Sequence, residues 1–247
     1  MISFTITMLL VLAYTVFGNN SMTSANSESY NLYPNYHASK LPELDYYKDY
    51  ETLRDSSNSV VIYPIFTQSA YEWNGFHDFY LGRCDSCITT PVQDYYKKSF
   101  ASSSNAYRIL EFLDYEIIDD VEIDRNPSIL QNFDKVILLH NEFVTRAEFE
   151  AISEHPKVIY LYPNALTSEV TYNSEKNSIT LLRGPGYPHE DIIGGFDWEF
   201  DNSQYFNDWS CHDWEFYQVP NGFMLNCYPE TELPHYGHDI LKTIKTL

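Results

Sequence analysis

The clearest pattern of hydrophobic and polar positions lies between Lys135 and Asn164. There, an apolar run, an amphipathic segment and a second apolar run predict a strand, a helix and a second strand. The apolar runs at residues 136–139 and 158–161 are short and β-branched, as is typical of strands buried on both faces of a parallel sheet. Between them, Thr145 and Glu148 have the spacing of a helix capping box. The pattern therefore predicts a βαβ unit.

The same alternation extends toward the N-terminus. Apolar positions repeat at helical spacing through residues 106–113, behind serines able to cap a helix. Residues 60–63 and 117–123 have strand patterns, and Asn126 with Pro127 marks the start of a short helix. Strands that alternate with helices at this spacing predict an α/β fold, with a mostly parallel sheet covered by helices on both faces.

The pattern changes after Asn164. Residues 169–173 and 178–182 alternate as strands do and predict a hairpin. The tetrapeptide Asp-Trp-Glu-Phe occurs at residues 197–200 and again at 213–216, and both copies alternate acidic and aromatic residues. We expect an added antiparallel C-terminal part that closes one edge of the sheet.

The first residues have the character of a targeting segment. No charged side chain precedes Glu28, and residues 2–17 are largely apolar. We predict a signal peptide or an uncleaved N-terminal anchor over residues 1–25, and therefore a secreted or cell-surface protein. A polar, tyrosine-rich linker is predicted to follow over residues 26–59, then a single α/β domain over 60–230 and a C-terminal tail over 231–247.

The four cysteines are expected to be bridged in an exported chain. The economical pairing joins Cys84 to Cys87 and Cys211 to Cys227. Four cysteines allow three connectivities, so spacing alone leaves the pairing open.

The charge balance excludes one class of partner. Lysine and arginine total 15 against 35 aspartate and glutamate residues, a net charge of -20. This field repels phosphate backbones and anionic lipid headgroups, so we predict no nucleic-acid partner and membrane contact only through an uncleaved N-terminal segment.

Candidate site residues follow the predicted strands. Ligands of open α/β sheets bind outside the carboxyl ends of the strands, where His140, Glu142 and Asn164 stand. These side chains fit an acid/base pair with an orienting group, or metal ligands; the alternative is that they are hydrogen-bonding loop residues. Further histidines and carboxylates complete such a site only if the long loops fold over it: His77, Asp78, His189, Glu190, Asp191 and His212. No cofactor is identified from these patterns.

A family resemblance rests on three stretches of sequence. They are His140-Asn141-Glu142, Tyr160-Leu161-Tyr162-Pro163-Asn164-Ala165, and Arg183-Gly184-Pro185-Gly186-Tyr187-Pro188 with Phe196-Asp197-Trp198. Together they resemble uncharacterised exported archaeal proteins whose domain is similar to class I glutamine amidotransferases, a flavodoxin-like layout also found in the dimethylformamidase large subunit. The resemblance covers roughly residues 60–228.

The resemblance implies fold more than activity. Working amidotransferases carry a cysteine nucleophile in a Gly-x-Cys-x-Gly turn, which this sequence lacks. The sequence therefore favours a non-catalytic binding or surface module. A hydrolase acting on amide-type bonds through His140, Glu142 and Asn164 is the first alternative, and a metal-binding extracellular protein is the second.

Overall fold

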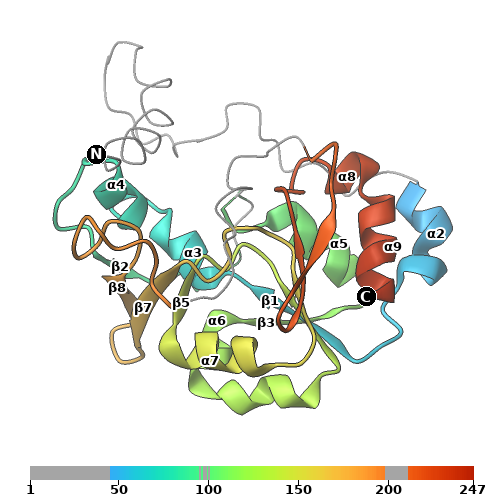
Figure 1. Cartoon of the computed structure of the whole chain (residues 1–247), viewed down its shortest axis with the longest axis horizontal. Helices are drawn as coiled ribbons and strands as arrows, with labels where there is room; N and C mark the ends of the chain where they lie inside the picture. Colours follow the sequence, from blue (N-terminus) through green and yellow to red (C-terminus); the bar gives the residue numbers. More distant parts are fainter. Residues whose placement is uncertain (1–44, 95, 97–98, 100, 198–210) are drawn as a thin grey trace, which may run out of the picture.

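The main sheet of the computed structural model has five parallel strands and one antiparallel strand at its edge (Figure 1). The structure describes residues 45–94, 96, 99, 101–197 and 211–247. Across the sheet the strands are β3 (Glu116–Asp119), β1 (Ser59–Tyr63), β4 (Lys135–Leu138), β6 (Val158–Tyr160), β10 (Gly222–Leu225) and β9 (Phe216–Val219). Numbered along the chain, the parallel strands have the order 2-1-3-4-5, which is the order found in flavodoxin.

Helices cover both faces of this sheet, as predicted. Alternate strand residues face opposite ways, so that Val61 and Ile137 belong to one core cluster while Val60 and Val136 belong to the other. The first face carries α2 (Asp45–Leu53), α5 (Ser104–Phe112), α8 (Leu233–Tyr236) and α9 (His238–Thr246). The second face carries α6 (Asp120–Arg125), the 3-10 helix η1 (Pro127–Asn132) and α7 (Arg146–Glu154). The mostly parallel α/β fold is confirmed.

The core extends beyond residues 60–230 at both ends. Leu53 in α2 and Ile240, Leu241 and Ile244 in α9 are buried in the first core cluster. Lys135 at the start of β4 is buried and donates hydrogen bonds from Nζ to the carbonyl oxygens of Ile244 and Lys245. The described part of the predicted linker and the C-terminal tail thus pack on the sheet.

The predicted βαβ unit is confirmed. Strands β4 and β6 are parallel neighbours with Val136 opposite Val158, and α7 lies between them in the sequence. Thr145 and Glu148 form the predicted capping box, in which each side chain accepts from the other residue's backbone N–H. The short strand β5 (Phe143–Thr145), which the sequence pattern did not predict, leads into the helix.

A second, four-stranded sheet flanks the first. It consists of β2 (Thr89–Pro91), β8 (Ser178–Arg183), β7 (Ser168–Asn173) and β5. Strands β7 and β8 form the predicted antiparallel hairpin. Helices α3 (Ile65–Ala70) and α4 (Phe76–Tyr80) follow β1, and a third core cluster joins α3 to this sheet through Phe66, Val170 and Ile179. The second sheet therefore stands beside the carboxyl end of β1.

Two predictions of strands need correction. The strand predicted over residues 117–123 ends at Asp119, because Asp119 and Glu122 form a capping box that starts α6. The second Asp-Trp-Glu-Phe copy ends at Phe216, where β9 begins, and only Asp197 of the first copy lies among the described residues.

The β9–β10 hairpin was not predicted, although it closes the sheet edge. Strand β9 pairs antiparallel with β10, and β10 lies parallel to β6. A Cβ atom at Gly222 would lie 1.8 Å from the Val158 carbonyl oxygen, so this close approach requires glycine. The predicted antiparallel closure is present at the edge, but most of it lies after the tetrapeptide on which it was based.

Both economical cysteine pairs are disulfides in the structure. Cys84 bonds to Cys87, and Cys211 bonds to Cys227. Two disulfides are compatible with an extracellular location. Within the described residues, no helix has the length and apolar character needed to cross a membrane.

Glu230 ties the C-terminal segment to α5. Its side chain is fully buried and accepts hydrogen bonds from the backbone N–H of Asn105 at 2.5 Å and of Ala106 at 3.2 Å. It also accepts from the hydroxyl of Tyr162 at 2.7 Å. The carboxylate thus occupies the N-terminus of α5, where exposed N–H groups and the helix dipole favour a negative charge.

We predict that Glu230→Gln lowers the free energy of unfolding by about 2–4 kcal/mol, because an amide NH₂ must then face N–H or O–H donors in a buried site. Urea unfolding measures this change. The control is Glu215→Gln at an exposed position, which should stay within about 0.5 kcal/mol of the parent protein. Equal losses for the two variants would contradict the role assigned to Glu230.

Candidate functional site

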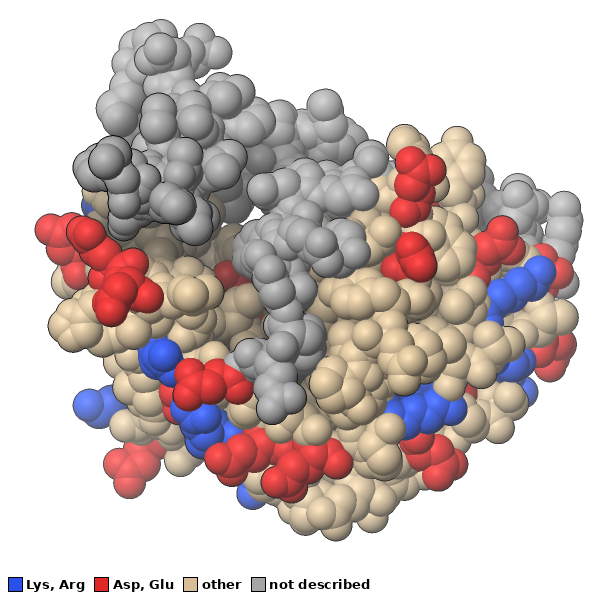
Figure 2. All heavy atoms as spheres, viewed as in Figure 1, with Lys and Arg blue, Asp and Glu red and all other residues tan. Residues whose placement is uncertain are grey.

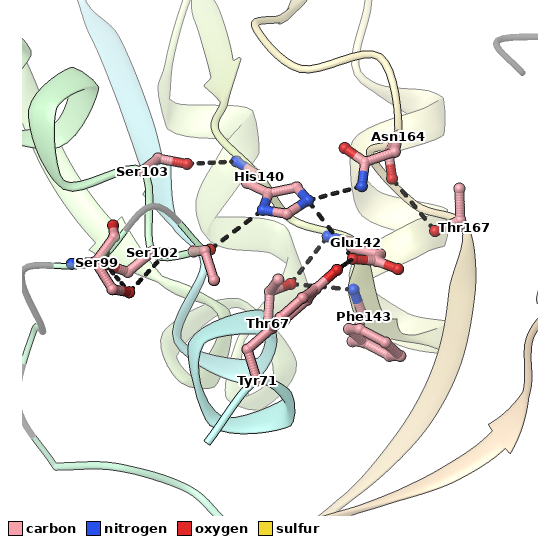
Figure 3. A network of polar contacts seen from close by, with 11 residues as sticks. Thr67, Tyr71, Ser99, Ser102, Ser103, His140, Glu142, Phe143, Asn164 and Thr167 are labelled. Carbon is pink, nitrogen blue, oxygen red and sulfur yellow. Dashed lines mark hydrogen bonds and ion pairs between the residues drawn. The ribbon is translucent and has the colours of Figure 1, made fainter. Parts of the chain in front are cut away.

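The three predicted candidate residues come together at the carboxyl edge of the main sheet. His140 and Glu142 follow β4, Asn164 follows β6, and the N-terminal part of α3 follows β1 (Figure 3). In a sheet of order 2-1-3-4-5, the crevice beside the first and third parallel strands is the topological switch point. The residues therefore lie where this fold class binds ligands.

The backbone N–H of His140 and both of its ring nitrogens have hydrogen-bond partners. Its ring is buried, its backbone N–H donates to Ser103 Oγ at 3.0 Å, and Nδ1 lies 3.2 Å from the carbonyl oxygen of Ala101. A carbonyl oxygen only accepts, so Nδ1 carries the proton and Nε2 of the neutral ring is an acceptor. Asn164 fits this requirement, because its Nδ2 lies 2.7 Å from Nε2. The lone pair that a general base would use is thus already hydrogen-bonded.

Glu142 completes the cluster. Its Oε2 accepts from the hydroxyl of Tyr71 at 2.8 Å and lies 3.5 Å from His140 Nε2. Thr67 Oγ1 accepts from the backbone N–H groups of Glu142 and Phe143, at 2.9 and 3.1 Å, which joins the end of β4 to α3. The cluster is therefore assembled from four separate segments of the chain, at residues 67–71, 101–103, 140–143 and 164, as Figure 3 shows.

Burial keeps the His140–Glu142 pair neutral over a wide pH range. It lowers the pKa of His140 to about 4, although the hydrogen bond to Ala101 acts in the opposite direction. Burial raises the pKa of Glu142 to about 7, although the hydrogen bond from Tyr71 opposes the rise. Because the acid has the higher pKa, the two side chains form a neutral pair between these values instead of a salt bridge.

A second acidic pair lies in the same region. Asp120 is fully buried and accepts from the side-chain amide of Asn141 at 2.6 Å and from the backbone N–H of Phe66 at 2.7 Å. Burial raises the pKa of Asp120 to about 7, and burial together with the neighbouring Asp120 charge raises that of Glu148 well above its usual value. The two carboxyls also interact through a side-chain hydrogen bond, which lowers the pKa of Asp120 and raises that of Glu148. One proton on Glu148 relieves their repulsion.

Ser103 has the backbone conformation of a strained turn residue. It lies in the left-handed region, with φ 50° and ψ 43°, directly before α5, and it is fully buried. Nucleophiles of some hydrolases occupy such a turn at the start of a helix. Here, however, Ser103 Oγ accepts from the backbone N–H of His140, and Glu230 already accepts from two N–H groups of α5. The groups that would activate a nucleophile and stabilise an oxyanion are thus engaged within the chain.

The other predicted candidates do not complete the site. His77 alone approaches it, since its ring stacks on Tyr71 with centroids 5.0 Å apart. Asp78 lies 3.5 Å from Arg83, and His212 lies 3.8 Å from Glu232. The segment formed by residues 189–191 is exposed. Among the described residues, no group of three or more histidine, cysteine, aspartate or glutamate side chains is placed to hold a metal ion.

Sequence patterns missed several members of the cluster. Tyr71 and Thr67 lie in or near a helix that was not predicted, and Ser103 was noticed only as one of several possible caps. Asp120 was assigned to the interior of a strand, although two adjacent aspartates after an apolar run do signal a strand end. Glu230 gave no signal, because its partner Asn105 is 125 residues away.

The buried acids should make the protein less stable as the pH rises. A carboxyl whose pKa is raised on folding contributes stability below its unfolded pKa, and this contribution is lost as the pH rises through the folded pKa. For Glu142, the rise of the pKa from its usual value of about 4.5 to about 7 corresponds to about 3 kcal/mol over that range. His140 acts oppositely, because its lowered pKa adds stability as the pH rises from about 4 to 6.5.

We predict that Glu142→Gln removes the carboxyl contribution, so that its stability relative to the parent protein rises between pH 4.5 and pH 8 by about 3 kcal/mol. Denaturant unfolding at pH 4.5, 6 and 8 measures the difference. The exposed Glu150→Gln in α7 is the matched control and should show no such pH-dependent gain. A constant difference between Glu142→Gln and the parent at all three pH values would contradict the burial argument.

Comparison with known proteins adds no relative to this picture. No protein-family model matches the chain, and no curated protein matches it. The function is therefore argued from the site.

Proposed function

We propose that this protein is an extracellular binding module built on an α/β domain similar to that of the class I amidotransferases, and that it does not hydrolyse its ligand. The observation that carries the proposal is the state of His140. Its ring is 3% exposed, and its acceptor nitrogen Nε2 is hydrogen-bonded to Asn164 at 2.7 Å. A base needs a free lone pair within reach of the proton that it removes.

The available nucleophiles also favour binding over hydrolysis. All four cysteines are bridged, so the oxidised chain offers no thiol. Ser103 is the residue that favours the hydrolase alternative, because of its left-handed conformation before α5. Its hydroxyl contacts the backbone of His140, and no hydrogen bond joins it to the imidazole ring in the described structure. A Ser–His pair requires that contact.

The polar cluster has a clear structural role in this proposal. Thr67, Tyr71 and Asn164 connect the segments after β1, β4 and β6 through His140 and Glu142. A network of this kind, with most of its members hydrogen-bonded, fixes the loops at the carboxyl edge and so preorganises the surface around them. Rigid loops lower the entropic cost of binding a ligand.

We predict that the oxidised protein hydrolyses L-glutamine, N-acetylglycinamide and p-nitrophenyl acetate no faster than its His140→Gln and Ser103→Ala variants do. Ammonia release and absorbance measure the rates, and circular dichroism checks that each variant is folded. The exposed His235→Gln is the control for loss of a histidine. Turnover by the parent protein and the His235 variant that is absent from both buried-site variants would establish the hydrolase instead.

A further inference from the structure

A pocket of about 450 Å³ opens beside the carboxyl ends of β1 and β3, and His140, Glu142 and Asn164 are not among its lining residues. Its base includes Ile65, which follows β1, and Val92, both of which are buried in the third core cluster. Val121 from α6 adds a further apolar side chain. The volume lies within the range of small-molecule sites, and the base suits an apolar group.

Two tyrosines give the pocket fixed walls. The ring of Tyr96 stacks on the buried ring of Tyr63 with centroids 3.9 Å apart, and its hydroxyl lies 3.4 Å from Asp119 Oδ2. The hydroxyl of Tyr172 donates to Asn177 Oδ1 at 2.8 Å. Both tyrosines line the pocket, and their rings add apolar surface to its lining.

Arg125 is exceptional among the arginines of this acidic chain. On the face shown in Figure 2, basic groups lie beside acidic ones, and most arginines have an assigned carboxylate: Arg54 with Asp114, Arg83 with Asp78, Arg146 with Glu169, and Arg183 with Asp197. Arg125 is exposed, lines the pocket, and forms no ion pair with any described residue. A guanidinium left unpaired in a protein of charge -20 is available to an external carboxylate.

A carboxylate without a partner lies in the same pocket. Asp94 is exposed, and no described residue forms an ion pair or hydrogen bond with its side chain. Although Asp94 and Arg125 have opposite charges, they do not pair with each other. The pocket lining thus contains a positive and a negative group that do not pair with each other, together with apolar side chains.

We propose that this pocket binds a small zwitterion with an apolar body, namely an L-amino acid with an apolar side chain. The ligand carboxylate pairs with Arg125, its ammonium group pairs with Asp94, and its side chain lies on Ile65, Val92 and Val121. This inference rests on the binding function proposed above and gives it a ligand class. A purely anionic ligand would meet Asp94 and Asp119, and a purely cationic one would meet Arg125, so a ligand that carries both charges is the best complement.

Isothermal titration calorimetry on the full oxidised chain tests the proposal, with L-leucine and L-phenylalanine as probes. We expect saturable binding that is weakened at least about tenfold by Arg125→Gln and by Asp94→Asn, since each removes a charge-assisted contact. The exposed Arg54→Gln and Asp85→Asn are matched controls outside the pocket and should leave the affinity within about twofold.

Single-charge and neutral analogues complete the test. We expect 3-methylbutylamine, 4-methylpentanoate and glucose to bind more weakly than leucine. Equal or tighter binding of any of the three overturns the proposal, as does absence of amino-acid binding or an unchanged affinity in Arg125→Gln. Those results leave the binding-module function standing. Leucine that is bound but chemically converted in a His140-dependent manner would contradict the non-catalytic function and leave the pocket assignment intact.

Discussion

The carboxyl edge of the sheet depends on one constraint: backbone N–H groups buried in the first turns of α3 and α5 need acceptors. Asp120 meets this need for α3, since it accepts the N–H of Phe66, and Glu230 meets it for α5, since it accepts those of Asn105 and Ala106. In many α/β proteins such helix N-termini bind a ligand's phosphate or carboxylate. Here the chain supplies its own carboxylates, so the positions that would hold an anion are already filled.

Burying carboxylates inside the protein is electrostatically unfavourable, and protonation of the buried acids reduces this cost. Glu142, Asp120 and Glu148 are acids buried close to one region of the fold, and burial raises the pKa of each. His140 stays neutral beside them because the same burial lowers its pKa. Between about pH 4 and pH 7 the region therefore holds these groups in largely uncharged form.

The sequence predicted the parts of the fold that depend on local patterns. The β4–α7–β6 unit, the β7–β8 hairpin and α5 follow from hydrophobic spacing and capping residues, and these are local properties. The β9–β10 hairpin was missed although Pro220-Asn221-Gly222 between two apolar runs is a local turn signal. The approach of His140, Glu142 and Asn164 was expected from strand ends alone. Tyr71, the partner of Glu142, was missed, as were Asp120 and Glu230 nearby, because each is brought in by a long-range contact that no periodicity encodes.

The hydrogen-bonded cluster around His140 and the open pocket lie at the same edge of the sheet, and the cluster helps to fix residues that line the pocket. The cluster immobilises the segments after β1 and β4, and Ile65, at the base of the pocket, lies two residues before Thr67 of the cluster. Asp119 also links the two regions. Its Oδ1 caps α6, and its Oδ2 accepts a hydrogen bond from Tyr96 in the pocket. The next residue, Asp120, accepts a hydrogen bond from Asn141, which lies between His140 and Glu142 of the cluster. A ligand bound in the pocket as proposed would therefore not need to order these walls. In the proposed binding module, the buried network would thus contribute to binding through rigidity, although Asp120, Glu142 and Glu148 do not line the pocket.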